Sequence, residues 1–313
     1  MVGELVDNGV QAILLRSTVE IGTCTKLNNK FGQKCNFIFA PERTVEGKAI
    51  EELLSLPQIA ACRDGKAKKL VQDCFSPLGI QIIHTEIWEE AELAKLVCNV
   101  YRDFNFSFAN LILRITKEFK LDSSKVFDLV SFDYSRMPVL KSGPVSGPCL
   151  TKDSLILSNS ISDKMAKDVL QTTRNINKAT VDTAIDDIKK IAKYLRISKI
   201  LFIGLTFKNS PFTTDTRDSH AIELIRNLEN VFECFIYDPF TDKNSKAEFR
   251  DKFIDNFKGE TYPLSVFCNN QQWVLDIYSK TYELNNSIKY WLYKPPVFLD
   301  SKTFSLGDHM SIE

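Results

Sequence analysis

The cysteine at position 149 has the surroundings of a reactive thiol. It follows a segment rich in Pro, Gly and Ser, residues 135–150, and it lies at a predicted helix start. The positive end of a helix dipole favours the thiolate, which is the nucleophilic form of cysteine. Lys152 lies nearby and adds a positive charge. A free cysteine is also a common small core residue, so these features alone leave a structural role open.

Polar residues that could act as acid, base or nucleophile recur at a spacing of four. The pairs are Glu42 with Glu46, Lys95 with Asn99, and Cys149 with Asp153. Residues four apart lie on one face wherever the segment is helical. Each pair could therefore hold two reactive groups together, although charged pairs at this spacing usually form only a solvated helix face.

The first elements that must position these residues have an α/β pattern. Apolar strands are predicted at 12–16, 37–42 and 79–85, and a charged amphipathic helix at 65–77. Residues 17–20 have the form of a capping box, which predicts that a helix starts there. The pattern begins abruptly with a helix and a strand, as though the first half of a doubly wound sheet were missing.

Two long helices are predicted in the middle of the chain, and a second α/β region follows them. Apolar residues recur every three or four positions over 89–119, and a second long helix is expected at roughly 159–195. A strand at 199–207, a helix at 220–228 and a strand at 233–240 come next, with later elements at 273–279 and 296–301. The fold class is therefore α/β, in three parts: 1–85, 86–196 and 197–313.

Composition narrows the possible functions. The 313 residues carry 40 Lys+Arg and 40 Asp+Glu, which gives no electrostatic case for nucleic acid or an anionic membrane. No apolar run approaches the ~20 residues of a membrane helix, and the acidic start is unlike a signal peptide. Eight Cys and three His show no metal-site spacing. We therefore expect a cytoplasmic protein with reduced thiols.

Five motifs occur in an order that resembles the UDP-glucose/GDP-mannose dehydrogenase family. They are Ser17-Thr18-Val19, Pro41 to Gly47, Glu92 to Asn99, Gly147 to Asp153, and Gly204 to Lys208 followed by Asp215, Arg217 and Ser219. The resemblance runs nearly end to end. Residues 99–105 with Asn110 look most like the branch that oxidises UDP-N-acetyl-hexosamines.

The resemblance implies an NAD-dependent, four-electron oxidation of a sugar C6 alcohol to a uronic acid, for polysaccharide precursors. It implies that Cys149 forms a thiohemiacetal and then a thioester, as a tether for the aldehyde. Lys95 and Asn99 would stabilise oxyanions. Glu42 would be the base for thioester hydrolysis, and Asp153 would orient water or a proton partner.

The same resemblance assigns the binding residues and the domains. Thr18 and Glu46 would line the nicotinamide side of the cleft, and Arg217 would bind the cofactor or, with Lys208, a diphosphate. Arg136 and Asn110 would bind substrate, Arg136 from its own subunit or across a homodimer built on the long central helix. The three parts become a partial Rossmann-like NAD domain, a central helical domain with the Cys149 loop, and a C-terminal Rossmann-like UDP-binding domain.

The sequence departs from the family pattern at three places. The GxGxxG turn that cradles the pyrophosphate is absent, so strands that should be central are expected at an exposed edge. Ser146 and Pro148 stand where small flexible residues are expected, and residues 209–214 form a longer turn. Two alternatives stay open. One is a protein that binds UDP-sugar or dimerises without redox activity, and the other is a β-hydroxyacid dehydrogenase relative, which needs no cysteine.

Overall fold

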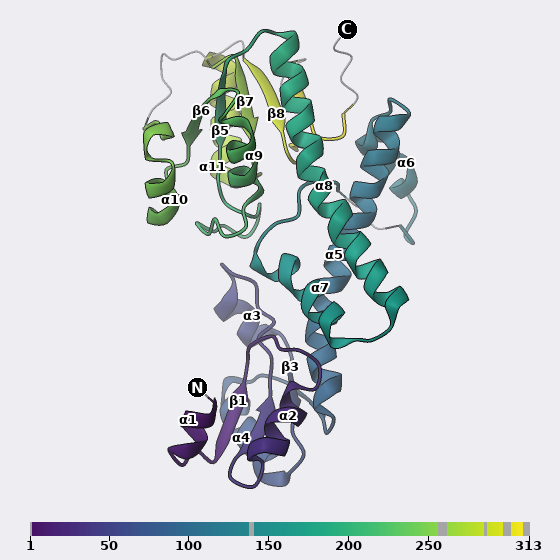
Figure 1. Cartoon of the computed structure of the whole chain (residues 1–313), viewed down its shortest axis with the longest axis vertical. Helices are drawn as coiled ribbons and strands as arrows, with labels where there is room; N and C mark the ends of the chain where they lie inside the picture. The colour runs from purple at the N-terminus through teal and green to yellow at the C-terminus, as the bar shows by residue number, and fades with distance from the viewer. Residues whose placement is uncertain (1, 138–140, 256–261, 285–286, 297–301, 309–313) are drawn as a thin grey trace. The chain divides into compact units, whose positions relative to one another are not determined.

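The computed structural model describes residues 2–137, 141–255, 262–284, 287–296 and 302–308 (Figure 1). In chain order the elements are α1 Val2–Asp7, β1 Ala12–Leu15, α2 Thr23–Phe31, β2 Asn36–Phe39, α3 Ala49–Ser55, β3 Gln58–Ala61, α4 Gly65–Phe75, η1 Ser76–Leu78, β4 Ile82–Thr85, α5 Trp88–Glu118, α6 Ser123–Ser131, α7 Pro148–Ser160, α8 Lys164–Tyr194, β5 Lys199–Ile203, α9 His220–Leu228, β6 Glu233–Tyr237, α10 Lys243–Glu248, η2 Arg250–Lys252, β7 Leu264–Phe267, α11 Gln272–Leu284, β8 Ile288–Trp291 and β9 Thr303–Ser305. Among these residues no helix has both the length and the apolar character that crossing a membrane requires.

The chain forms two compact units. Unit 1 comprises Met1–Tyr101 and Lys152–Gln171, and unit 2 comprises Arg102–Thr151 and Thr172–Glu313. The helices α5, α7 and α8 each contribute residues to both units. The three domains expected from the sequence, 1–85, 86–196 and 197–313, therefore stay a prediction.

Unit 1 contains a four-stranded sheet in the order β1-β2-β3-β4. β1 pairs with β2 in parallel and β3 with β4 in parallel, whereas β2 and β3 are antiparallel and share a single paired position. β1, β2 and β4 confirm the predicted strands, and β1 lies at the edge of the sheet in the described residues. The short strand β3 escaped prediction because its four residues, QIAA, have little β propensity.

Side chains of β2 alternate between the two faces of this sheet. Phe37 and Phe39 pack in a cluster with residues of α1, α2 and α5, whereas Ile38 packs against residues of α4. This alternation is the period-two pattern of a strand buried on both faces. The sheet is therefore the middle layer of an α/β sandwich.

The predicted helix start at residues 17–20 is wrong. These residues are not helical, and α2 begins at Thr23 after Gly22, whose φ is 85°. The capping group comes instead from the fully buried side chain of Glu92 on α5. Its Oε2 accepts from the Gly22 N–H at 2.6 Å and its Oε1 from the Cys24 N–H at 2.8 Å. A carboxylate there satisfies N–H groups that lack helical partners and complements the helix dipole.

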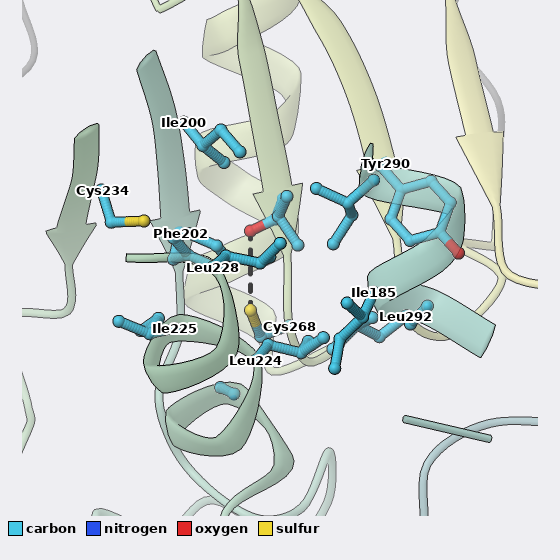
Figure 2. Close-up of a cluster of buried hydrophobic side chains, with 14 of the residues drawn as sticks. Ile185, Ile200, Phe202, Leu224, Ile225, Leu228, Cys234, Cys268, Tyr290 and Leu292 are labelled. Carbon is cyan, nitrogen blue, oxygen red and sulfur yellow. Dashed lines mark hydrogen bonds between the residues drawn. The ribbon is translucent and has the colours of Figure 1, made fainter. Parts of the chain in front are cut away.

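Unit 2 contains a parallel sheet in the order β6-β5-β7-β8-β9. Ile200 and Phe202 of β5 face a cluster formed with α8 and α9, and Figure 2 shows Leu224 among the α9 side chains of this cluster. Leu201 on the opposite face packs with residues of α11. The sheet is thus covered on both faces, as in Rossmann-like folds.

The predictions for the second half of the chain are largely confirmed. The long helices appear as α5 and α8, the helix at 220–228 as α9, and the strand at 233–240 as β6. The strand expected at 199–207 ends at Ile203, because Gly204 has a φ of 84° and the chain turns there. The element expected at 273–279 is part of α11, and 297–301 lie outside the described residues.

Candidate active site

Cys149 lies in the exposed first turn of α7, immediately after Pro148. Proline is favoured at the first helical position because the N–H it lacks would have no helical partner there. The departure from the family pattern at Pro148 therefore suits the helix start. Asp153 lies one turn further along α7, so the predicted spacing of four does fall on a helix.

The loop before Cys149 is held against other residues of unit 2 by close packing. Gly147 has a φ of 91°, and a Cβ there would overlap the ring of Phe207. At Gly143 a Cβ would overlap the ring of Tyr293. The Tyr293 hydroxyl donates to the backbone oxygen of Pro144 at 2.7 Å. Both glycines are therefore required by the space available, and Gly147 by its backbone angle as well.

Asn110 on α5 also holds this loop. Its Oδ1 accepts from the Gly143 N–H at 2.9 Å, and its Nδ2 donates to the Gly143 oxygen at 3.0 Å and to Asn177 Oδ1 at 2.9 Å. Asn110 is fully buried, as is Asp103, which bonds Asn177 and pairs with Arg174 at 2.5 Å. These bonds fix a backbone segment, and the predicted binding of substrate by Asn110 stays a prediction.

Two other predicted catalytic residues meet in unit 1. Asn99 Nδ2 on α5 donates to Asp153 Oδ2 on α7 at 2.6 Å. Asp153 is 1% exposed, and its Oδ1 has no hydrogen-bond partner among the described residues, with Lys152 Nζ 3.9 Å away. Lys95 is half-buried one helical turn before Asn99. An oriented carboxylate with a free lone pair could accept a proton or bind water.

Glu42 follows β2 in a loop, so the expected helical pairing with Glu46 is absent. Glu46 is exposed in a turn. Glu42 forms an ion pair with Arg16, and its Oε1 accepts from the N–H groups of Arg43 at 2.9 Å and Thr44 at 3.0 Å. Burial raises the pKa of Glu42, but the hydrogen bonds from Thr44 and Arg16 outweigh it, so the net pKa is lowered. Glu42 is therefore an ionised carboxylate at neutral pH.

Thr18 and Glu42 lie at the same edge of the unit 1 sheet. Thr18 is half-buried in the loop after β1, and Glu42 comes three residues after β2. The two strands are parallel, so their carboxyl ends meet at one edge. Ligands of α/β proteins usually bind at such an edge.

The cations predicted to bind phosphate lie at the carboxyl edge of the sheet in unit 2. The order β6-β5-β7 makes β5 the point where the sheet reverses its direction of growth, which is the usual ligand position in open α/β sheets. Lys208 follows β5, with its Nζ 5.4 Å from the centroid of the Phe207 ring. Arg217 is exposed and bonds Asp215 through Nε and NH2. Arg136, which was predicted to bind substrate, lies in a different segment, after α6. Its side chain is exposed, with the guanidinium over the Tyr134 ring.

Polar residues after β7, which the sequence analysis did not select, shape the same edge. Asn269 Nδ2 and Gln271 Nε2 donate to Thr206 Oγ1 at 3.0 and 2.9 Å, and Gln271 also donates to the Lys208 backbone oxygen at 3.2 Å. The run Asn269-Asn270-Gln271-Gln272, which comes just after an apolar strand, was the available signal.

The predicted catalytic residues are divided between the two units. Cys149 belongs to unit 2, whereas Lys95, Asn99 and Glu42 belong to unit 1. Their assembly into one site stays a prediction.

The chain is similar to known nucleotide-sugar dehydrogenases. Residues 89–179 match the central domain of the UDP-glucose/GDP-mannose dehydrogenase family. A UDP-N-acetyl-D-mannosamine dehydrogenase of Methanocaldococcus jannaschii is 28% identical over 239 residues, 75% of this chain and 54% of that protein. An NDP-N-acetyl-D-galactosaminuronic acid dehydrogenase of Ralstonia solanacearum is 26% identical over 235 residues, 69% of this chain and 54% of that protein. The chain thus spans about half the length of these relatives.

A solved structure supports the fold. The UDP-D-ManNAc dehydrogenase of Pyrococcus horikoshii matches with a TM-score of 0.80 at 20% identity, over 98% of this chain and 76% of that chain. At this level of identity the likeness shows the fold alone, a mixed α/β arrangement with Rossmann-like sheets.

Proposed function

We propose that the chain belongs to the UDP-glucose/GDP-mannose dehydrogenase family, whose central domain matches residues 89–179, and that it takes part in the NAD-dependent oxidation of the C6 alcohol of a UDP-sugar to a carboxylate. The observation that carries the proposal is the bond between Asn99 and Asp153. It joins two motif residues on different helices, and α7 carries the exposed Cys149 one turn before Asp153.

The proposed reaction uses these residues in sequence. The alcohol gives up a proton and a hydride and becomes an aldehyde, and the Cys149 thiol adds to the aldehyde carbon to form a thiohemiacetal. Loss of a second hydride and a proton gives a thioester. Water then breaks the carbon–sulfur bond, releasing the carboxylate and the thiol. Lys95 and Asn99 stabilise the oxyanions, Glu42 activates the water and Asp153 orients it.

NAD supplies the hydride acceptor in this proposal. The loops at the carboxyl edge of β1 and β2, with Thr18, Glu42 and Glu46, suit the nicotinamide side of such a cofactor. Arg217 suits a phosphate of the cofactor, and Lys208 the diphosphate of the UDP-sugar. No GxGxxG turn for the pyrophosphate occurs in the sequence. The residues present therefore fit one part of the cofactor.

The relatives named above suggest an N-acetylated hexosamine as the sugar, and a role in polysaccharide precursors follows from that class of product. The protein is further proposed to be a homodimer. Along α5 in unit 2, Phe104, Phe108, Leu111 and Ile115 recur every three or four residues, and each is between 37% and 45% exposed. An apolar helix stripe of this length is typical of a protein interface.

The test is to incubate the protein with NAD and a panel of UDP-sugars, and to follow reduced cofactor and sugar acid together. The proposal predicts two reduced cofactors per sugar with a UDP-N-acetyl-hexosamine. Cys149→Ala should lower turnover by about a thousandfold or more, because no tether forms. The exposed Cys74→Ala is the matched control and should keep full turnover. Full turnover of Cys149→Ala would contradict the mechanism.

A second candidate is a protein that binds UDP-sugar or dimerises without redox activity, and it is favoured by the parallel sheet of unit 2 with Lys208 and Arg217 in the segment after β5. Calorimetry separates the two. Binding of UDP-sugar without heat from NAD and without reduced cofactor would support this second candidate against the first.

A further inference from the structure

The loop before Cys149 contains a buried contact that has no part in the proposed reaction. His220, the first residue of α9, is 1% exposed. Its Nδ1 lies 2.7 Å from Ser146 Oγ, and its Nε2 lies 2.9 Å from the backbone oxygen of Cys268. The ring of Tyr293 packs edge-on against the imidazole, with centroids 5.5 Å apart. The imidazole is thus fixed on three sides within unit 2.

The donors and acceptors in this contact can be assigned. The Cys268 oxygen can only accept, so Nε2 carries a proton, and a neutral imidazole then accepts at Nδ1. Burial lowers the pKa of His220 to about 4, which keeps the ring neutral near pH 7. The Ser146 hydroxyl therefore donates to His220. The same hydroxyl lies 3.0 Å from the Phe207 oxygen, but its single proton serves one acceptor at a time.

Residues on both sides of Cys149 contact the segment that leads into α9, namely Asp218 and His220. Before Cys149, Ser146 bonds His220, and the Gly147 N–H donates to the Asp218 backbone oxygen at 3.4 Å. After Cys149, the Thr151 hydroxyl lies 3.4 Å from Asp218 Oδ2, but its shorter bond is to the Gly147 oxygen at 2.9 Å. The two contacts to Asp218 are long for hydrogen bonds, so the bond from Ser146 to His220 is the strongest link to this segment.

We propose that Ser146 and His220 form a latch that holds the loop and the start of α7 in one conformation and so positions Cys149. Ser146 occupies a position at which the family motif has a small flexible residue. The bond to His220 therefore depends on a residue by which this chain departs from the motif. The importance of the latch for catalysis rests on the proposed function. The presence of the latch can be tested independently of that function, because hydrogen exchange is measured without turnover.

The test measures hydrogen exchange by mass spectrometry in peptides covering residues 141–151 of the full chain. Ser146→Ala removes the donor. His220→Gln keeps a donor near the position of Nε2, and so the bond to Cys268, but loses the acceptor for Ser146. A hydrogen bond worth about 0.5–1.5 kcal/mol corresponds to about two- to tenfold faster exchange in both variants. His220→Asn is the matched control, because its amide oxygen can occupy the position of Nδ1 and should restore slow exchange.

The outcomes separate positioning from general damage. Exchange in β5, residues 199–203, should stay unchanged in all variants. The double variant Ser146→Ala with His220→Gln should exchange no faster than Ser146→Ala alone, because that variant already removes the bond to His220. Unchanged exchange in Ser146→Ala would overturn the proposal, and so would a His220→Asn variant that exchanges as fast as His220→Gln. A loss of turnover by itself would test only the proposed function.

Discussion

The loop that carries the proposed nucleophile and the loop that carries the proposed base are held in different ways. Residues 141–149 in unit 2 are fixed by buried neutral hydrogen bonds and by ring contacts at two glycines. Residues 40–47 in unit 1 are held by backbone bonds to β1 and by Gln58, which donates to the Pro41 oxygen, and in addition by carboxylates. Arg16 forms an ion pair with Glu42, and the two side chains are 30% and 43% exposed, respectively. Glu52 accepts a hydrogen bond from the Val45 N–H at 2.6 Å.

The difference has a physical consequence. A loop held by shape and buried bonds tolerates almost no change in volume, but salt hardly affects it. A loop held by half-exposed charges tolerates changes in volume and responds to salt and pH. This suits their proposed roles, since a nucleophile must meet one carbon atom, whereas a base can act through a water molecule.

The largest effect is expected from Gly147→Ala. The positive φ adds strain and the new Cβ overlaps the Phe207 ring, so we expect a loss of about 2–5 kcal/mol in unfolding free energy. Urea unfolding, followed by circular dichroism, measures it.

Two controls separate the causes. Gly143→Ala has the overlap, with the Tyr293 ring, but no positive φ. Gly9→Ala has a φ of 84° with nothing within 4 Å of the new Cβ and should lose only about 1–2 kcal/mol. If Gly147→Ala were no worse than Gly9→Ala, packing at Phe207 would not hold the loop.

The next effect is the pH dependence that His220 gives to unit 2. Burial lowers its pKa from 6.5 to about 4, so the unfolded chain binds the proton more tightly than the folded one. Its contribution is complete above about pH 6.5 and is lost as pH falls toward 4, by about 3 kcal/mol in all. Urea unfolding between pH 4 and 7 measures the loss. In His220→Asn this part of the slope should vanish, and an unchanged slope would contradict the buried neutral ring.

A smaller effect, in unit 1, is expected from Glu92→Ala. The variant leaves the Gly22 and Cys24 N–H groups without a partner at the buried end of α2, at a cost of about 2 kcal/mol. Glu92→Gln keeps one acceptor and should lose less. Thermal unfolding measures both. Equal losses would mean that the one acceptor kept by Gln contributes nothing, which would contradict this account of hydrogen bonding by Glu92.

The sequence predicted the elements with strong periodicity and missed the contacts between distant residues. The helices α5, α8 and α9 could be predicted because their apolar residues recur with the helical period. The start of α2 could not, since its capping carboxylate lies 70 positions away.

The site shows the same limit. The motifs selected Asn99 and Asp153, which do meet, but local patterns could not select His220 or Gln271. Both act on residues more than fifty positions away, and only the fold brings them there. Asn110 matched the motif, yet it is buried in bonds to the backbone of Gly143, a position that sequence cannot distinguish from one at the substrate.

The smallest effect is expected from Arg16→Met, at the half-exposed ion pair. Glu42 has a lowered pKa, so its contribution to stability is present above about pH 4.5 and is lost as pH falls below that value. Because both side chains reach solvent, removing Arg16 should cost about 0.5 kcal/mol or less, and less still at high salt. The sharper measurement is the Glu42 carboxyl titration by NMR, in which the pKa should rise in Arg16→Met while Thr44 still donates to Oε1. An unchanged titration would mean that backbone N–H groups alone hold the carboxylate. The loop of Glu42 would then be fixed in the same way as the loop of Cys149.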